Sequence, residues 1–498
     1  MGVVIKQSFW NSVWAYAGVG IGFINTLILR PAFLTDSQIG LIAVVTGNAL
    51  MMAPFVALGM PNTYIRFFPD LGKNKEQERK FLSLQFLLII LANLIFSGLA
   101  FLFIDFIKAQ YIDEAPEYNQ YIFVSILIMA LFSLFTHMHA FSRAKLNVII
   151  PGFLKEAYLR ILNALLIVLF SWDLISFEQM IYCIILSYLT ATLVLGIYVV
   201  LFQKLSLTLN IKGLERDWKK KLFKLASFNT IMATCSSIYS NVSITMIPAL
   251  LGTAANGVYS VCLYIGIVIE MPKRSMWQII TPIVGKEFTN NNLKEVESLY
   301  KKASLSLGVI GGLFLIGIIT NLSDLFQLIP NGETYEAGFY VVVGIALSKF
   351  IDMLFSFNSE LLYYTKYYKY NLYFYVIISI IIISLNRYLI PVWGINGAPI
   401  AFLISTVLFN VMKFILIKSK LGMSPFSKTH WLLLLYAAGT FALFWHLPIS
   451  SYPLFNIIAR SIGITIVFVG LAYFSRLSPD INNLIKSICK KYLNINLP

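Results

Sequence analysis

Long apolar runs recur from one end of the chain to the other, and short polar stretches separate them. A helix needs roughly 20 apolar residues to cross the ~30 Å hydrocarbon core of a bilayer. The pattern therefore predicts fourteen transmembrane helices. Their predicted ranges are 8–29, 38–60, 81–104, 120–140, 151–171, 179–202, 225–248, 254–284, 304–320, 337–362, 371–390, 397–417, 431–447 and 457–475.

Composition agrees with an all-α integral membrane protein. Of 498 residues, 58% are hydrophobic and only 12% are charged, whereas about a quarter are charged in a soluble domain. If both termini are cytoplasmic, most of the 38 Lys and Arg residues fall in cytoplasmic segments, as the positive-inside rule requires. Membrane topology thus explains the net charge of +15, and no nucleic-acid partner is predicted.

The most basic connection, residues 203–224, divides the chain. It separates an N-terminal six-helix lobe (1–202) from a C-terminal six-helix lobe (225–420), and residues 421–498 hold two extra helices and a basic cytoplasmic tail. The segments "LTDSQIGLIAVV" and "LGTAANGVYSVC" echo each other, each with a glycine after a polar turn and a long apolar run behind it. Such internal repeats are typical of transporters built from two related lobes.

Signatures of enzymes are absent from the sequence. His137 and His139 are two residues apart and so face different sides of a helix, which makes a poor metal site. No glycine-rich phosphate loop ends in Gly-Lys-Ser/Thr. The longest predicted external loops, near 105–119 and 321–336, are too short for a catalytic domain. We therefore predict a protein that is not an enzyme and that uses no cofactor or metal.

Charged residues inside the predicted spans are the main candidates for function, because each costs ~2.5–3.5 kcal/mol at the centre of a bilayer. "PGFLKEAYLRIL" places Glu156 and Arg160 four residues apart, the spacing of a helical ion pair, although Arg160 could also extend to the cytoplasmic interface. "IALSKFIDMLF" places Lys349 and Asp352 three residues apart near the midplane, where they could neutralise each other.

A third charged group, Glu270, Lys273 and Arg274, interrupts the apolar run "IGIVIEMPKRSMWQIITPIVG". The helix could end at Met271, leaving Lys273 at the interface. Alternatively, a helix kinked near Pro272 could continue and expose its charges to an internal cleft. The run 254–284 is longer than one crossing requires and stays apolar after the charges, which favours the second interpretation.

The seventh predicted span, "SFNTIMATCSSIYSNVSITMIP", is rich in hydroxyl and amide side chains, including Asn229, Ser237 and Asn241. A helix that faces lipid would not favour these residues. They could form hydrogen bonds between helices, or they could face water or a sugar.

The arrangement of the fourteen spans as twelve plus two and four segments of the chain carry a resemblance to a known family: "LTDSQIGLIAVV", "GMPNTYIRFFPDLGKNK", "NGETYEAG" and "WGINGAPIAF". In these features the chain resembles the polysaccharide transporters of the multidrug/oligosaccharidyl-lipid/polysaccharide (MOP) exporter superfamily. The resemblance covers the whole chain. It implies two six-helix lobes around a central cleft plus two C-terminal helices. It also implies an O-antigen-type flippase that moves a polyprenyl-diphosphate-linked oligosaccharide across the bacterial cytoplasmic membrane by alternating access. The family has no catalytic motif to transfer.

Under this resemblance, cations in the cleft would replace the hydration of a lipid diphosphate. The candidate substrate-binding residues are Lys273, Arg274, Lys349, Arg160, Asn229, Ser237 and Asn241. The candidate ion-coupling or charge-balancing residues are Glu270, Asp352 and Glu156. The expected partners are the lipid-linked oligosaccharide and membrane lipids, with a polymerase and other polysaccharide-assembly proteins as further partners.

Three alternatives stay open at this point. An ion-coupled multidrug exporter of the same fold would have a more acidic and aromatic site. A peptidoglycan-precursor exporter would share the cationic cleft. A membrane glycosyltransferase or polymerase, from a different class, would need an external acidic loop that the sequence lacks. The glycan, the coupling ion and the oligomeric state cannot be derived from the sequence.

Overall fold

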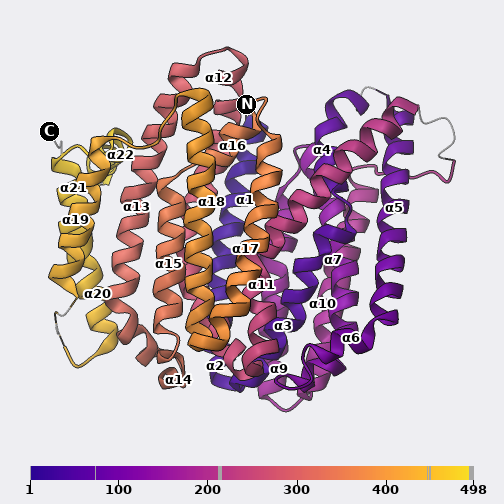
Figure 1. The fold of residues 1–498 in the computed structure, drawn as a ribbon, viewed down its shortest axis with the longest axis horizontal. Helices are drawn as coiled ribbons and strands as arrows, with labels where there is room; N and C mark the ends of the chain where they lie inside the picture. Colours follow the sequence, from indigo (N-terminus) through magenta and orange to yellow (C-terminus); the bar gives the residue numbers. More distant parts are fainter. Residues whose placement is uncertain (1, 73, 211–215, 446, 448–449, 493–498) are drawn as a thin grey trace. The chain divides into compact units, whose positions relative to one another are not determined.

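The computed structural model describes residues 2–72, 74–210, 216–445, 447 and 450–492 (Figure 1). The elements in these ranges are helices, and no strand occurs among them. The chain forms two compact units. The first unit comprises residues 1–260 and 375–395, and the second comprises residues 261–374 and 396–498.

In the first unit, α7 packs between α3 and α10. The helices of this unit are α1 (Gly2–Phe23), η1 (Ile24–Leu29), α2 (Arg30–Phe33), α3 (Asp36–Val56), α4 (Met60–Leu71), α5 (Lys75–Leu102), α6 (Ile104–Ala109), η2 (Pro116–Gln120), α7 (Ile122–Ala144), α8 (Ile149–Phe153), η3 (Leu154–Tyr158), α9 (Leu159–Ser171), α10 (Phe177–Leu201) and most of α11 (Arg216–Ile267) and α17 (Lys369–Trp393).

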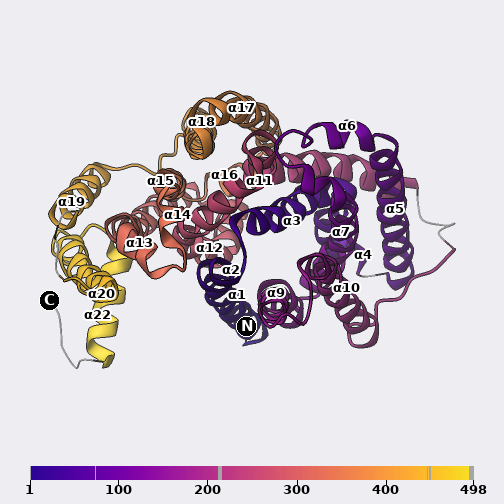
Figure 2. The same ribbon diagram turned by 90° about the horizontal axis from the view of Figure 1, so that it is seen from below.

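In the second unit, α13 packs against α15, α19 and α20, and α15 packs against α18 (Figure 2). Its helices, after the end of α11, are η4 (Val268–Glu270), α12 (Met271–Thr289), α13 (Leu293–Leu328), α14 (Gly332–Glu336), α15 (Phe339–Leu354), α16 (Asn358–Tyr363), α18 (Gly397–Leu421), α19 (Lys428–Phe444), α20 (Pro453–Ile464), η6 (Thr465–Val469), α21 (Gly470–Phe474) and α22 (Pro479–Tyr492). The short η5 (Gly394–Asn396) lies at the boundary between the units.

The prediction of an all-α membrane protein is confirmed. Each of the fourteen predicted spans overlaps at least one helix of the described residues. Within the described ranges, nine helical stretches are long and apolar enough to cross a membrane. Two of these, Asp217–Trp277 with 61 residues and Lys369–Leu421 with 53, are each long enough for more than one crossing at ~1.5 Å per residue. Helices α8, η3 and α9 cover the predicted span 151–171, and α15 and α16 cover most of 337–362 with a break at 355–357. Helix α19 covers the span 431–447 as far as Phe444.

The first unit is held together where the two echoing segments of the sequence cross. A side chain at Gly40 of α3 would overlap the carbonyl of Thr253, and one at Gly257 of α11 would overlap the carbonyl of Asp36. Asn256 Nδ2 donates to Gly40 O at 2.9 Å. Glycine is therefore required on both sides of this close approach.

The compact units of the structure do not coincide with the lobes predicted from the sequence. The predicted lobes, 1–202 and 225–420, follow membrane topology and remain a prediction. The compact units differ from them because residues 225–260 and 375–395 pack with the first unit. Within α11, Gly252 has φ 88° and interrupts the helix, so the predicted seventh and eighth spans are separate segments.

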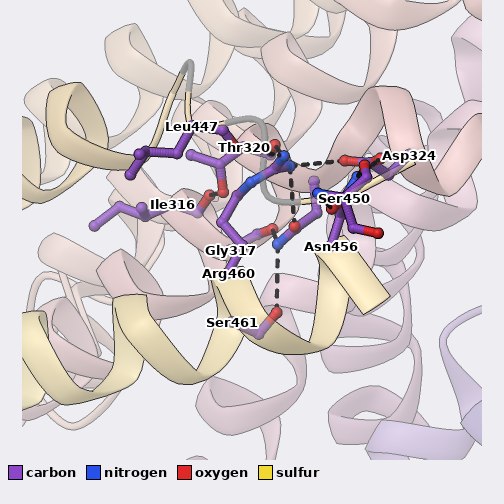
Figure 3. Close-up of polar contacts among 10 residues, drawn as sticks. Ile316, Gly317, Thr320, Asp324, Leu447, Ser450, Asn456, Arg460 and Ser461 are labelled. Carbon is purple, nitrogen blue, oxygen red and sulfur yellow. Dashed lines mark hydrogen bonds and ion pairs between the residues drawn. The ribbon is translucent and has the colours of Figure 1, made fainter. Parts of the chain in front are cut away.

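The last helices are fastened to the second unit by a buried ion pair (Figure 3). Arg460 Nη1 of α20 lies 2.8 Å from Asp324 Oδ2 of α13 and donates to Thr320 O at 2.6 Å. Asn456 Nδ2 donates to the other oxygen of Asp324 at 3.0 Å. Beside this network α13 and α20 line an open pocket of about 300 Å³ with a mostly apolar lining.

Candidate functional site: a charged network in the second unit

The charged stretch between α11 and α12 forms a break between two helical segments. The α-helix stops at Ile267, a 3₁₀ turn covers Val268–Glu270, and α12 continues to Thr289. Pro272 lies in the first turn of α12, where its missing N–H costs no helical hydrogen bond. The predicted continuation of helical structure past the charges, after a break at Val268–Glu270, is confirmed, and the position of Lys273 in a cleft or at the interface stays a prediction.

Glu270 contacts two of the three predicted site cations that lie in the second unit. Its Oε2 lies 2.6 Å from Lys349 Nζ of α15, and its Oε1 lies 3.2 Å from Arg274 Nε, one turn along α12. Lys349 Nζ also lies 5.3 Å from the ring centroid of Phe402. Each oxygen of the Glu270 carboxylate thus has its own cation.

The third cation, Lys273, forms an ion pair with the Asp352 carboxylate. Lys273 Nζ also donates to the backbone oxygen of Asp352 at 3.1 Å. Asn410 Nδ2 of α18 donates to Asp352 Oδ1 at 3.1 Å. The hydrogen-bonding capacity of this carboxylate is therefore used by two other helices.

These contacts correct one prediction. The alternative in which Lys349 and Asp352 neutralise each other is wrong, because each pairs instead with a residue on the segment 270–274. Spacing along α15 allows an i, i+3 pair, but the oppositely charged groups across the helix interface are closer. Glu270 and Asp352 both form ion pairs in this structure, and their predicted ion-coupling or charge-balancing role stays a prediction.

The network has one cation more than it has carboxylates, since Lys273, Arg274 and Lys349 face Glu270 and Asp352. Arg274 is the most accessible member, with 61% of its side chain exposed. A guanidinium presents a planar fork of donors that suits phosphate oxygens. The arrangement can therefore bind a diphosphate or another anion of similar shape.

Several polar residues next to this network were not predicted as site residues. Lys413 of α18 is buried; its Nζ donates to Ser359 Oγ at 2.7 Å and lies 3.3 Å from the Phe409 ring centroid. Asn358 Nδ2 donates to Asn410 Oδ1 at 2.8 Å, which links α16 to α18. Glu360 of α16 is also buried. Lys413 and Glu360 also lie inside predicted spans, 397–417 and 337–362, and the cost of a charge there is a signal that could have identified them.

In the first unit, the predicted ion pair between Glu156 and Arg160 is confirmed, with 3.8 Å between Glu156 Oε2 and Arg160 Nη1. Asn25 Nδ2 donates to Arg160 O at 2.7 Å. Asn25 and Glu156 each lie in a π-helical turn, η1 and η3, a feature that occurs often at functional sites. Gly18 of α1 packs so closely that a side chain there would overlap the Arg160 guanidinium.

The polar residues of the seventh span form hydrogen bonds within the first unit. Asn229 is buried, and its Nδ2 donates to Thr63 Oγ1 at 3.0 Å. Ser237 Oγ donates to Leu50 O at 3.2 Å, and Asn241 Nδ2 donates to Ser237 O at 3.0 Å. Of the two interpretations given for these side chains, helix packing accounts for these contacts. In this structure Asn229 is an interhelical hydrogen-bond residue.

No metal cluster is found in the part of the chain that the structure describes, where no three His, Cys, Asp or Glu residues gather. The charged network is accordingly a set of ion pairs and hydrogen bonds.

No protein-family model matches the chain, and no curated protein matches it. Several solved structures are similar to the chain. The chain is similar to the lipid II flippase MurJ in an inward closed conformation, with a TM-score of 0.74 and 12% identity over 94% of this chain and 99% of that one. It is also similar to an inward-facing multidrug resistance MATE transporter of the MOP superfamily, with a TM-score of 0.62 and 13% identity over 84% and 98% of the two chains.

A third similar structure is a MOP superfamily transporter from Pyrococcus furiosus, described as having a binding pocket of reversed polarity. Its TM-score is 0.56, with 13% identity over 84% of this chain and 95% of that one. At these identities the matches establish the fold. The chain is a multi-pass membrane protein with the fold that MurJ and the MATE transporters share.

Proposed function

We propose that this chain, which has the fold of MurJ and the MATE transporters, is a flippase for a polyprenyl-diphosphate-linked oligosaccharide. The cargo would be an O-antigen, capsule or exopolysaccharide repeat unit, moved across the bacterial cytoplasmic membrane by alternating access. Both termini would be cytoplasmic, and a polymerase and other polysaccharide-assembly proteins would be its partners. The similar structures are those of a flippase and a transporter, which supports transport over catalysis.

The observation that carries this proposal is the excess cation in the charged network of the second unit. Glu270 and Asp352 hold Lys273 and Lys349 in place, while Arg274 has only part of one carboxylate and is largely exposed. A diphosphate that enters a low-dielectric region needs such charge-assisted hydrogen bonds to replace its hydration. A site for cationic drugs would instead require excess negative charge.

Transport of a fluorescent polyprenyl-diphosphate oligosaccharide into proteoliposomes tests the proposal. Arg274→Gln is expected to reduce the initial rate about tenfold, because a hydrogen bond to a charged group contributes ~1.5–3 kcal/mol and 1.4 kcal/mol is a factor of ten. The Arg274→Lys variant keeps the positive charge but loses the planar fork of donors, so its transport rate should lie between those of the wild type and Arg274→Gln. A wild-type rate in Arg274→Gln would exclude this residue from the substrate site.

Lys301→Gln is the matched control, because Lys301 forms an i, i+4 ion pair with Glu297 on α13 of the same unit, at 2.6 Å. This variant removes one helical cation without touching the network, so its transport rate should equal that of the wild type. An equal loss in both variants would point to a general effect of net charge.

Export of a peptidoglycan precursor is the second candidate. It is favoured by the match to the lipid II flippase, which extends over 94% of this chain, against 84% for the MATE transporter. Competition in the same vesicles separates the two, because excess lipid II should slow transport only if the pocket accepts its head group. Efflux of a cationic dye would instead support a drug exporter, and release of free polyprenyl diphosphate would support a glycosyltransferase or polymerase.

A further inference from the structure

The last turn of α15 carries Asp352 of the charged network, and each of its free backbone carbonyls has a partner. The last four carbonyls of an α-helix have no donor within the helix. Those of Ile351 and Met353 accept from backbone N–H groups just past the end of α15. The other two, on Asp352 and Leu354, accept from side chains of neighbouring helices.

These two carbonyls are held by different helices of the second unit. Asp352 O accepts from Lys273 Nζ of α12 at 3.1 Å, and the Asp352 carboxylate forms an ion pair with the same ammonium group. Leu354 O accepts from the hydroxyl of Ser304, a buried residue of α13. The end of α15 is thus fixed by the charged network and, through a separate contact, by α13.

The hydroxyl of Ser304 is in turn held by α19. Its Oγ lies 2.8 Å from Nε2 of His430, which is buried. The backbone N–H of Ser427 donates to Nδ1 of the same ring at 3.0 Å, so Nδ1 is an acceptor and carries no proton. Because Ser304 gives its single hydroxyl proton to Leu354 O, the ring must donate its Nε2–H to Ser304. The hydrogen bonds therefore run in one direction, from His430 to Ser304 to Leu354 O.

Apolar packing accompanies this chain of hydrogen bonds. Helix α13 packs against both α15 and α19 (Figure 1). Gly308 lies one turn after Ser304 on α13, and a side chain there would overlap Leu433 of α19 and press on Leu354 of α15. The end of α15 and the first half of α19 thus contact the same face of α13.

We infer that His430 and Ser304 are positioning residues for the charged network, because they fix the end of α15 that carries Asp352 opposite Lys273. Helix α19 thereby acts on the network without touching it. When the chain of hydrogen bonds is broken, Leu354 O loses its donor, and the last turn of α15 holds the Asp352 carboxylate less firmly against Lys273. The effect on anion binding rests on the proposed function, whereas the positioning of Asp352 does not.

Thermal denaturation of the full-length protein in detergent tests the positioning without any ligand. Lys273→Gln removes the cation of the pair, and the fall in melting temperature that it causes is measured in several backgrounds. The fall should be smaller in Ser304→Ala and in His430→Leu than in the wild type, because the pair is already weakened there and coupled residues are not additive. A fall as large as in the wild type in both backgrounds would overturn the inference.

Ser306→Ala is the matched control. Ser306 is also a buried serine of α13, and its Oγ lies 2.9 Å from Oγ of Ser478, which precedes α22. This variant removes a link to the C-terminal helices that does not involve α15, so the full fall should remain. A reduced fall in this background as well would assign the effect to general loosening and would count against the inference.

A conservative variant separates the hydrogen bond from the bulk of the imidazole ring. His430→Gln keeps a side-chain N–H donor for Ser304, so the fall caused by Lys273→Gln should be close to that in the wild type. A fall as small as that in His430→Leu would exclude donation from residue 430 as the positioning contact. This variant also serves if His430→Leu fails to fold, and Ser304→Ala is then the broken form for comparison.

Calorimetric titration with farnesyl diphosphate tests the effect on the anion site. Ser304→Ala should weaken binding about threefold, and it should have no further effect when Asp352→Asn is already present. Ser306→Ala should bind like the wild type. A wild-type affinity in Ser304→Ala would disprove the effect on anion binding. Failure of the wild type to bind the probe would reject the proposed substrate class, while the denaturation series would still decide the positioning.

Discussion

Arg460 and Arg274 both pair with a carboxylate in the second unit, but their environments differ. Arg460 is 8% exposed, and its guanidinium donates to Asp324, Thr320 O and Leu447 O. Arg274 is 61% exposed and meets Glu270 at 3.2 Å through Nε. The same two functional groups thus form a buried contact with several acceptors in one place and an exposed contact with one acceptor in the other.

The difference separates two uses of a charge in a membrane protein. A guanidinium with several fixed acceptors serves as an anchor, and Arg460 holds α20 to α13 in this way (Figure 3). A guanidinium that shares its single carboxylate with Lys349 keeps donors available for a ligand. The presence of an ion pair alone does not distinguish these roles, but the number of acceptors and the exposure of the cation do.

The largest effect on stability is expected from Arg460→Met. It leaves the Asp324 carboxylate buried and without its cation, and breaking a buried pair by removing one partner costs roughly 3–5 kcal/mol. The melting temperature in detergent should fall markedly, and the protein should be less abundant in membranes. Scanning fluorimetry with an intrinsic or thiol-reactive dye measures the shift.

Two controls accompany this variant. Arg387→Met removes an exposed arginine of the first unit and should change the melting temperature little. Combining Arg460→Met with Asp324→Leu replaces both charges by apolar groups, so the double variant should be more stable than the single one. If the double variant is less stable, the Asp324 interactions with other groups, and not the ion pair, hold the helix.

An intermediate effect is expected when charges of the network are exchanged. Exchanging Lys273 and Asp352, as Lys273→Asp with Asp352→Lys, keeps opposite charges facing each other and should cost less than either single change. Exchanging Lys349 and Asp352 in the same manner puts a carboxylate opposite Glu270 and an ammonium opposite Lys273. We expect this crossed exchange to destabilise the protein by roughly 2–4 kcal/mol, since the pairs are only partly buried.

Thermal denaturation of the two exchanged proteins and of the single variants Lys273→Asp and Asp352→Lys measures the loss of stability that each exchange causes. If the Lys349–Asp352 exchange is the better tolerated one, the partners found in the structure are wrong. Equal tolerance of both would mean that the network senses net charge and not specific pairs.

The positions of the helices could be predicted from sequence because hydrocarbon thickness acts locally. Each run of about 20 apolar residues must be helical to satisfy its backbone in lipid, and no knowledge of neighbours is needed. The same local cost drew attention to Glu270, Lys273 and Lys349. The boundary of the first unit could not be predicted in this way, since it depends on the close approach of Gly40 and Gly257, two residues far apart in the chain.

Which charged residues of the network form ion pairs with each other could likewise not be predicted from the sequence. Spacing along one helix suggested an ion pair between Lys349 and Asp352. In the structure, each of them instead forms an ion pair with a residue in the segment 270–274. Glu360 and Lys413 were recognisable as charges in apolar spans, but only the packing of α16 on α18 brings them near the network. The ion pair of Glu156 and Arg160 was predictable because both residues lie on one helical face.

The smallest effect on stability is expected from Arg274→Gln, and it completes the comparison with Arg460. An exposed i, i+4 ion pair contributes ~0.2–1 kcal/mol, and Glu270 keeps Lys349 as a partner at 2.6 Å after the change. The melting temperature should therefore stay close to that of the wild type, and membrane abundance should be unchanged, even though transport falls. Measuring both properties on one preparation is decisive. A loss of stability as large as that of Arg460→Met would show that Arg274 is also an anchor, and its transport defect would then carry no information about substrate.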